Sequence, residues 1–302
     1  MSFHTLREAF KTQYPDAGEP FCCRAPGRIN LMGEHLDYNG LPVLPMTLSQ
    51  EVRLAFTPRQ DAKVYLHNLD NAFRPAVFEN ATEIKMSAEG AWENYAKAVL
   101  QGVNRNFEVA EFKGMDVLVE STLPHGAGLS SSTALSVALG LAYLSVLDVS
   151  LDEDSSRLDF AAVLAKAEQY VGTQGGGMDQ AIILNGGEGQ VSKINFFPLR
   201  LESLPMPGGY RFVVSHTGVT ADKSGACRDA YNAGPRYSRL ICALVKKHLQ
   251  QEFGEDFMLP NLGELWFGPL CLTYDETRLY CEAAVPDDFM HLNTVAMLLE
   301  LS

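Results

Sequence analysis

The stretch 124-PHGAGLSSSTALSVALG-140 joins a β-strand to a buried helix through a Gly/Ser loop. The preceding run 115-MDVLVEST-122 predicts the strand, and the apolar run 133-TALSVALGLAYLSVL-147 predicts a helix of about four turns. The loop between them brings free backbone N–H groups together with the positive end of a helix dipole. This strand–loop–helix unit is therefore a candidate anion-binding site.

Three adjacent hydroxyls, Ser130, Ser131 and Ser132, follow Gly126 and Gly128 in this loop. Serine hydroxyls can bond phosphate oxygens or a Mg²⁺-bound water. A helix N-cap needs only one serine, so the pattern favours phosphate binding over simple capping. The loop is not a Walker A loop, because no lysine follows at the required spacing. It is not the dinucleotide fingerprint either, because the third glycine is absent.

Helical and strand patterns mix irregularly along the rest of the chain. Because no regular βαβ alternation appears, the sequence predicts an α+β fold, and 302 residues suit two domains. Helices are predicted over 3–12, 91–107, 158–172 (with Gly172 as its C-cap) and 229–253, the last mostly after Pro235. A strand followed by a turn is predicted over 21–33, and strands are predicted over 41–59, 115–122, 189–199 and 210–218.

Composition narrows the class of function. A net charge of -13 argues against a nucleic-acid partner, although a few local cations can still hold a phosphate-bearing small ligand. Six cysteines without metal spacing indicate free thiols in a reducing compartment. Neither a signal peptide nor an apolar run of about 18 residues is seen, so we expect a cytoplasmic protein without a membrane partner.

The segment 24-RAPGRINLMGEHLDYNG-40 crowds Arg28, Glu34, His35 and Asp37 between apolar strand residues. Carboxylates accept hydrogen bonds and histidine can donate or accept, so this set can meet several hydroxyls of a polyol. Taken alone, the segment is equally well explained as a solvated turn with incidental charges.

The segment 172-GTQGGGMDQA-181 leads from three glycines into Asp179, and Glu168 stands eleven residues before that aspartate. A carboxylate beside a phosphate-binding loop commonly binds a metal or takes a proton. If Arg28 lies near Asp179, the pairing favours the charged carboxylate. The alternative is an Asp that merely caps a helix after a glycine turn, and the residues leave both readings open.

The three clusters, in this order, resemble the GHMP small-molecule kinases and, within them, the galactokinase and N-acetylgalactosamine kinase branch. GRINLMGEHLDYNG is similar to the galactokinase signature, PHGAGLSSSTAL to the phosphate-binding motif, and GTQGGGMDQAIILNGGEGQ to the corresponding run of the N-acetylgalactosamine kinases. The likeness covers roughly residues 3–245. It implies a two-domain GHMP kinase fold, with a ribosomal protein S5 domain 2-like N-terminal domain (1–190) and a ferredoxin-like C-terminal domain (191–302).

The roles of the family's motif residues are carried over to matching positions. Asp179 matches the carboxylate that takes the proton of the anomeric hydroxyl, and Arg28 matches the cation that keeps this carboxylate ionised. The match of Tyr231 rests on the tyrosine alone, because 231-YNAGPRYSR-239 departs from the family's Tyr-x-x-Arg-Arg. The resemblance implies ATP and Mg²⁺ as cofactors. It also implies sugar contacts at Glu34, His35, Asp37, Gly176, Gly177 and Tyr231, an ATP loop at Gly126, Gly128, Leu129, Ser130 and Ser131, and a Mg²⁺ neighbourhood at Ser132 and Glu168.

The chain departs from the family near its C-terminus. The family's third, Gly-rich motif does not occur in the sequence, and residues 254–302 have no clear counterpart. We therefore expect an incomplete C-terminal domain that leaves an apolar face exposed, either as a partner surface or as a source of instability.

The implied activity is ATP-dependent phosphorylation of the C1 hydroxyl of galactose or N-acetylgalactosamine. A sugar- and ATP-binding homologue without turnover, or an inactive truncated kinase, is the alternative. An isoprenoid or amino-acid kinase of the same superfamily is disfavoured by His35 and Asp37.

Overall fold

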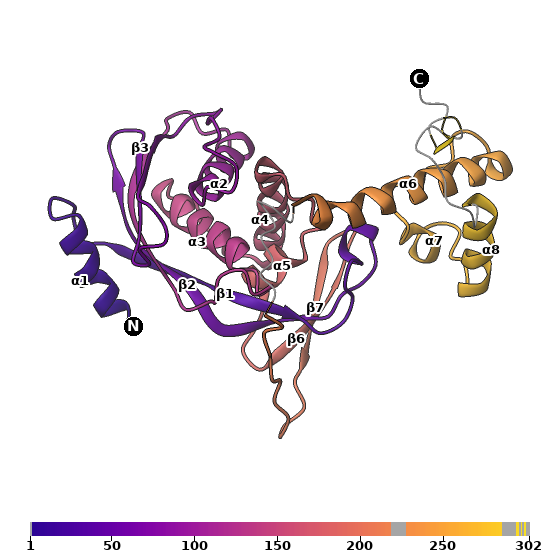
Figure 1. Ribbon diagram of the computed structural model, residues 1–302, viewed down its shortest axis with the longest axis horizontal. Coiled ribbons are helices and arrows are strands. Elements are labelled where there is room, and N and C mark those ends of the chain that lie inside the picture. The colour runs from indigo at the N-terminus through magenta and orange to yellow at the C-terminus, as the bar shows by residue number, and fades with distance from the viewer. Residues whose placement is uncertain (1, 219–227, 286–293, 296, 298, 300–302) are drawn as a thin grey trace.

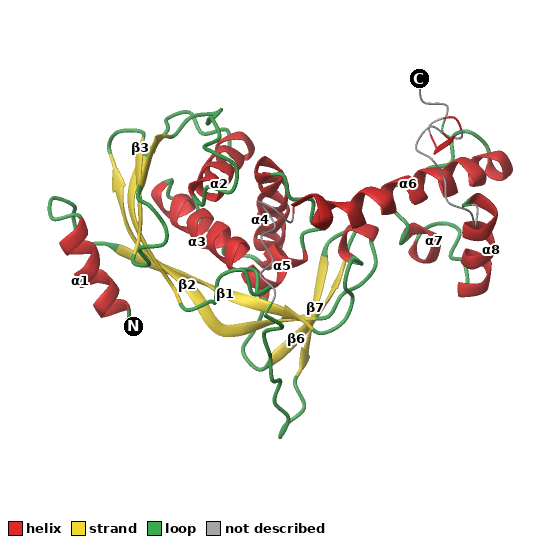
Figure 2. Ribbon diagram, viewed as in Figure 1, coloured by secondary structure: helices red, strands yellow, loops and turns green. Residues whose placement is uncertain are grey.

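The structure is a computed structural model that describes residues 2–218, 228–285, 294, 295, 297 and 299. A curved sheet carries helices on both faces, and a helical arm extends from one end (Figures 1 and 2). Among the described residues no helix is long and apolar enough to cross a membrane.

The sheet has five strands in the order β1-β2-β5-β3-β4, and a separate ribbon pairs β6 with β7. Among the strands that the structure describes, β3 and β5 pair in parallel and the other pairs are antiparallel. A bridge between Val43 and Ile194 joins the ribbon to the body. The strands are β1 (Phe21–Asn30), β2 (Pro45–Arg59), β3 (Lys63–Asn68), β4 (Ala76–Glu79), β5 (Gly114–Ser121), β6 (Gln190–Asn195) and β7 (Arg200–Pro205).

Alternating side chains of β2 and β5 divide the interior into two layers. Leu54 and Val117 face the main core under the central helices, whereas Ala55 and Leu118 face the smaller core under α1. The helices are α1 (Phe3–Gln13), α2 (Glu93–Asn106), α3 (Ser131–Val146), α4 (Asp154–Ala167), α5 (Met178–Asn185), α6 (Arg228–Phe253), α7 (Glu264–Phe267) and α8 (Tyr274–Ala284). Short 3-10 turns are η1 (Asp37–Asn39) and η2 (Glu168–Val171).

The mixed α and β content agrees with the predicted class, and the predicted helices at 3–12 and 91–107 are confirmed. Gly172 ends the predicted helix over 158–172 in the left-handed region, with a φ of 83°. The helix predicted after Pro235 begins earlier, at Arg228, and contains that proline. Its added turns are held by the protein body, since Asn232 Nδ2 donates to the carbonyl of Gly172 at 2.7 Å.

The strand predicted over 210–218 is wrong: the segment is described, but it pairs with no strand among the described residues. Tyr210 is 75% exposed and Val213 is 92% exposed. Strand-forming side chains cannot hold an extended conformation without a neighbouring strand to satisfy the backbone. Phe212 and Val214 in this segment are also exposed.

A separate core, which we call the second core, lies within residues 228–285. Cys242, Val245 and Leu249 of α6 pack there against Leu259 and Leu265. A capping box closes the start of α8, where Thr273 and Glu276 bond each other's backbone N–H groups. We call α6, α7, α8 and the segments joining them the arm.

Candidate active site

The centre of the site is an ion pair between a buried arginine and a half-buried aspartate, on two segments far apart in sequence. Arg28 lies on β1 just after the bulge at Pro26, and Asp179 lies in the first turn of α5. Arg28 Nε donates to Asp179 Oδ1 at 2.6 Å and Nη2 donates to Oδ2 at 2.7 Å. Burial disfavours the guanidinium charge, but Asp179 outweighs it and raises the pKa of Arg28. Asp179 is thus held by a bidentate cation rather than serving as a helix cap.

Ser130 links the serine loop to the same carboxylate. It lies at the N-cap position of α3, but its side chain caps no helix N–H, and its φ is 57°. Its hydroxyl donates instead to Asp179 Oδ2. The capping explanation of this serine is therefore excluded, and an L-residue is held in the left-handed region by a contact to Asp179.

A second carboxylate, Asp37, is fixed beside the first. Its Oδ2 accepts from the N–H of Gly176 at 2.9 Å. Burial raises the pKa of Asp37 and the charge of Asp179 raises it further, whereas the Gly176 N–H lowers it. Burial and then the charges of Asp179 and Asp37 likewise raise the pKa of the Tyr231 hydroxyl, so Tyr231 stays a neutral donor.

These groups line a cavity of about 420 Å³, a size typical of small-molecule sites. Glu34 and His35 lie at its exposed edge, and His35 Nδ1 is 2.7 Å from the Tyr38 hydroxyl. The predicted residues that line it are Arg28, Glu34, His35, Asp37, Gly128, Ser132, Glu168, Gly177, Asp179 and Tyr231. We call this cavity the sugar cleft, after the sugar contacts that the resemblance implies for the residues lining it.

A larger cavity of about 1170 Å³ adjoins the sugar cleft, and Gly128 and Ser132 line both. Gly126, Ser130 and Ser131 also line it. Its lining includes three rings that sequence reasoning missed. The Phe73 ring centroid lies 5.6 Å from that of Trp92 and 5.4 Å from that of His125. His125 stands within the Gly/Ser motif itself, which was the available signal.

Two predicted residues lie outside both cavities. Leu129 packs partly against the main core, and its carbonyl accepts from the N–H of Arg28 at 3.2 Å. Gly176 reaches the site only through its N–H bond to Asp37. Both hold neighbouring groups in place.

The predicted Mg²⁺ neighbourhood is brought together by the fold. Ser132 and Glu168, from α3 and η2, both line the sugar cleft. A hydroxyl and a carboxylate are oxygen donors of the kind that Mg²⁺ takes, alongside substrate phosphates and water. Within the described residues no group of three His, Cys, Asp or Glu side chains could hold a metal alone. The residues thus fit a metal that arrives with a nucleotide.

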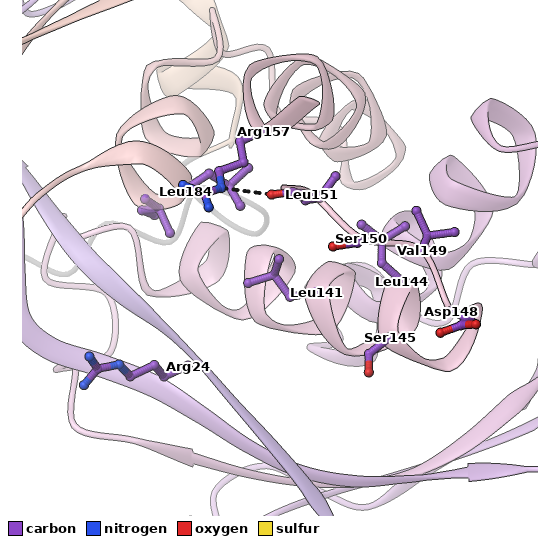
Figure 3. Close-up of a pocket in the computed structure, with 11 residues that line it drawn as sticks. Arg24, Leu141, Leu144, Ser145, Asp148, Val149, Ser150, Leu151, Arg157 and Leu184 are labelled. Atoms are coloured by element: carbon purple, nitrogen blue, oxygen red, sulfur yellow. Dashed lines mark hydrogen bonds between the residues drawn. The ribbon is translucent and has the colours of Figure 1, made fainter. Parts of the chain in front are cut away.

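A third cavity, of about 490 Å³, lies at the opposite ends of α3 and α5 (Figure 3). Arg157 Nε donates there to the carbonyl of Leu151 at 3.2 Å, beside Leu141 and Leu144. None of the predicted site residues lines this cavity. The candidate site is therefore the sugar cleft with its adjoining cavity.

Comparison with known families agrees with this geometry. Residues 8–58 match the galactokinase galactose-binding signature, and residues 94–187 match the GHMP kinases N terminal domain. Galactokinase of Candida parapsilosis is 32% identical over 79% of this chain and 47% of that protein. Galactokinase of Candida maltosa is 33% identical over 59% of this chain and 84% of that protein. The chain spans about half the length of the first of these relatives.

Solved structures show the same fold. Lactococcus lactis galactokinase complexed with galactose superposes with a TM-score of 0.68 at 21% identity, over 98% of this chain and 73% of that chain. Methanococcus jannaschii mevalonate kinase gives a TM-score of 0.50 at 15% identity, over 61% of this chain and 56% of that chain. The described chain therefore has the GHMP kinase fold, and it covers only part of each of these structures.

Proposed function

Because the chain belongs to the galactokinase family of GHMP kinases, we propose that it is an ATP-dependent sugar 1-kinase. It transfers the γ-phosphoryl group of ATP to the anomeric hydroxyl of galactose or N-acetylgalactosamine. A bond forms between the C1 oxygen and the γ-phosphorus as the bond between that phosphorus and the β–γ bridging oxygen breaks. The products are the sugar 1-phosphate and ADP. The hydroxyl proton passes to a carboxylate of the enzyme.

The bidentate pair of Arg28 and Asp179 is the single observation that carries this proposal. A half-buried carboxylate with a fixed cationic partner stays ionised and can accept the anomeric proton. The same guanidinium lies next to the loop at which the transferring group would sit, since its Nη1 donates to the Gly128 carbonyl at 2.8 Å. Phosphoryl transfer needs chiefly this kind of positioning and charge stabilisation.

The sugar occupies the cleft above this pair. Asp37 and Tyr231 present a carboxylate and a phenol to its hydroxyls, with Glu34 and His35 at the rim. A site built to bond a particular hydroxyl can reject the epimer by a factor of about 10⁴. Gly177 also lines the cleft and adds no side chain, which supports room for a 2-acetamido group.

ATP occupies the adjoining cavity, with its base at Phe73, Trp92 and His125 and its phosphates at the serine loop. Aromatic rings stack on nucleobases, and the N-terminus of α3 favours negative charge. Ser132 and Glu168 would hold Mg²⁺, which neutralises phosphate charge when it is bound. We place the activity in the cytoplasm, where the free thiols of Cys22, Cys23, Cys242, Cys271 and Cys281 would persist.

The test is ATP consumption by the 302-residue chain with galactose, N-acetylgalactosamine and glucose. Asp179→Ala is the active-site variant, and Asp154→Ala, at a side chain 92% exposed, is the matched control. Turnover with a galacto-configured sugar that disappears only in Asp179→Ala supports the kinase. A folded chain that binds ATP and sugar without turnover would instead be a sensor. Mevalonate and homoserine are assayed in parallel, and turnover with one of these alone would assign the chain to the isoprenoid or amino-acid kinases of the superfamily.

A further inference from the structure

The divergent segment 254–285 contacts the turn that carries the predicted sugar-binding residues. We call Leu36–Gly40 the signature turn. The N–H of Gly263 donates to the carbonyl of Asn39 at 2.7 Å. The side chain of Asn261, only 7% exposed, packs directly against the Cα of Gly40. Two segments more than two hundred residues apart thus meet at this turn.

The contact is too close to be incidental. A Cβ on Gly263 would lie 2.5 Å from the carbonyl oxygen of Gly40 and 3.0 Å from that of Asn39. These neighbours are backbone atoms and cannot swing aside. Only a glycine permits the observed approach, so the sequence of segment 254–285 is fitted to the signature turn.

The second core makes the contact rigid. Leu259 and Leu265, on either side of Asn261 and Gly263, are 5% and 0% exposed and pack on α6. The chain between them is closed by successive backbone bonds, including Trp266 N–H to the Gly263 carbonyl at 3.0 Å. The arm therefore presents Asn261 and Gly263 as a fixed surface.

The start of α6 holds the same turn from another side, as seen where the purple turn before β2 lies beside the orange start of α6 (Figure 1). A Cβ on Gly234 would lie 2.9 Å from the Tyr38 hydroxyl and 3.3 Å from His35 Nδ1. Arg239 of the same helix also donates to the side chain of Gln174 in the glycine-rich loop. The arm thus contacts two of the segments that line the sugar cleft, the signature turn and the glycine-rich loop.

We propose that the arm is part of the sugar site, and that Asn261 and Gly263 are positioning residues that fix Asp37 and His35 through the signature turn. This role rests on the proposed function, because the turn matters as the sugar-binding element. The proposed role of segment 254–285 is to hold in place the signature turn, which forms one wall of the sugar cleft. A wall displaced by about 1 Å is enough to lose much of the binding.

The experiment compares Gly263→Ala and Asn261→Ala with Gly208→Ala, a glycine whose added Cβ meets nothing within 4 Å. Hydrogen exchange is followed in peptides covering 36–41, 115–121 and 126–132. The amides of Asn39, Gly40 and Leu41 are bonded within the turn and report on its order. Affinities for galactose and for ATP are measured by calorimetry on the same proteins.

We expect both arm variants to speed exchange at 36–41 by about tenfold while 115–121 and 126–132 keep their protection. Galactose affinity falls by about tenfold or more and ATP affinity is unchanged. Unchanged exchange at 36–41 in both variants overturns the proposal. Faster exchange everywhere also overturns it, because the contact would then serve global stability. Failure of the parent protein to bind galactose counts against the proposed function, and the exchange result separately decides whether the arm orders the turn.

Discussion

Ser130 and Arg28 donate to the same oxygen of Asp179: the serine hydroxyl and Nη2 of the arginine both bond Oδ2. The hydroxyl of Ser130, predicted to contact ATP phosphate, is thus bonded to the proposed base. Ser130, Ser131 and Ser132 all line the adjoining cavity in which we propose that ATP binds. We therefore predict that the three serines divide between two tasks.

Ser130→Ala should lower kcat by about ten- to a hundredfold, because one of the charge-assisted bonds that orient Asp179 is lost. The KM for ATP should stay unchanged. Ser130→Gly should show the same loss of kcat and, since glycine accepts the φ of 57°, no loss of stability. Steady-state kinetics against both substrates tests this, with Ser131→Ala as the control that raises the KM for ATP instead. A Ser130→Ala enzyme with weakened ATP binding and normal kcat would assign this serine to the nucleotide.

Arg28→Ala should lower the free energy of unfolding by about 3 kcal/mol or more, because it leaves the half-buried carboxylate of Asp179 without its cation. The side chains of Arg28 and Asp179 are 8% and 18% exposed, so solvent does little to replace the partner. Arg28→Ala with Asp179→Asn should recover part of this loss. Urea denaturation of the two single variants and the double variant measures the coupling. Additive single effects would show that the pair contributes little.

Asp37→Asn should stabilise the fold at neutral pH while weakening sugar binding about tenfold or more. The pKa of Asp37 is raised in the folded protein, chiefly by burial. Ionisation of this group therefore destabilises the fold, and the stability present below its ordinary pKa of 3.8 is lost as the pH rises through the folded value. Melting temperatures of both proteins from pH 3 to pH 8 check this. The melting temperature of Asp37→Asn should exceed that of the parent protein by an amount that grows with pH. A difference that shrinks as the pH rises would contradict the raised pKa of Asp37.

Trp92→Ala should weaken ATP binding by about tenfold or more and leave galactose binding unchanged. Loss of one stacking ring costs about 1–3 kcal/mol per base. The Trp92 indole N–H also donates to the Arg74 carbonyl at 2.8 Å, so the conservative variant Trp92→Phe keeps a ring but loses this bond. Nucleotide titration of both variants distinguishes stacking from loop support. Equal ATP affinity in the parent protein and both variants would show that the nucleobase of ATP does not bind beside Trp92.

Val213→Lys should reduce self-association and leave the melting temperature unchanged. Val213 is 92% exposed in an apolar segment that pairs with no strand among the described residues, and such segments template association. Light scattering across a concentration series measures the effect, with the exposed Gln251→Lys as a matched charge control. If both variants scatter as the parent does, this segment is not an association surface.

The sequence by itself determined the local pieces of this protein and its family. The spacing of apolar residues and the glycines at turns act over a few residues. The strand at 115–122, the helix at 91–107 and the helix end at Gly172 could therefore be predicted from neighbouring residues. The resemblance of the three motifs likewise placed the candidate residues without any geometry. Such signals hold because each depends on contacts within one or two turns of chain.

Only the tertiary structure decided which side chains meet. The pairing of Arg28 with Asp179 depends on how α5 packs across the sheet, and the contact of Gly263 with Asn39 depends on the second core. Sequence reasoning gave 210–218 a strand because its side chains favour one, yet a strand exists only where another lies beside it. Long-range packing sets distances between segments, and no local pattern of residues encodes those distances.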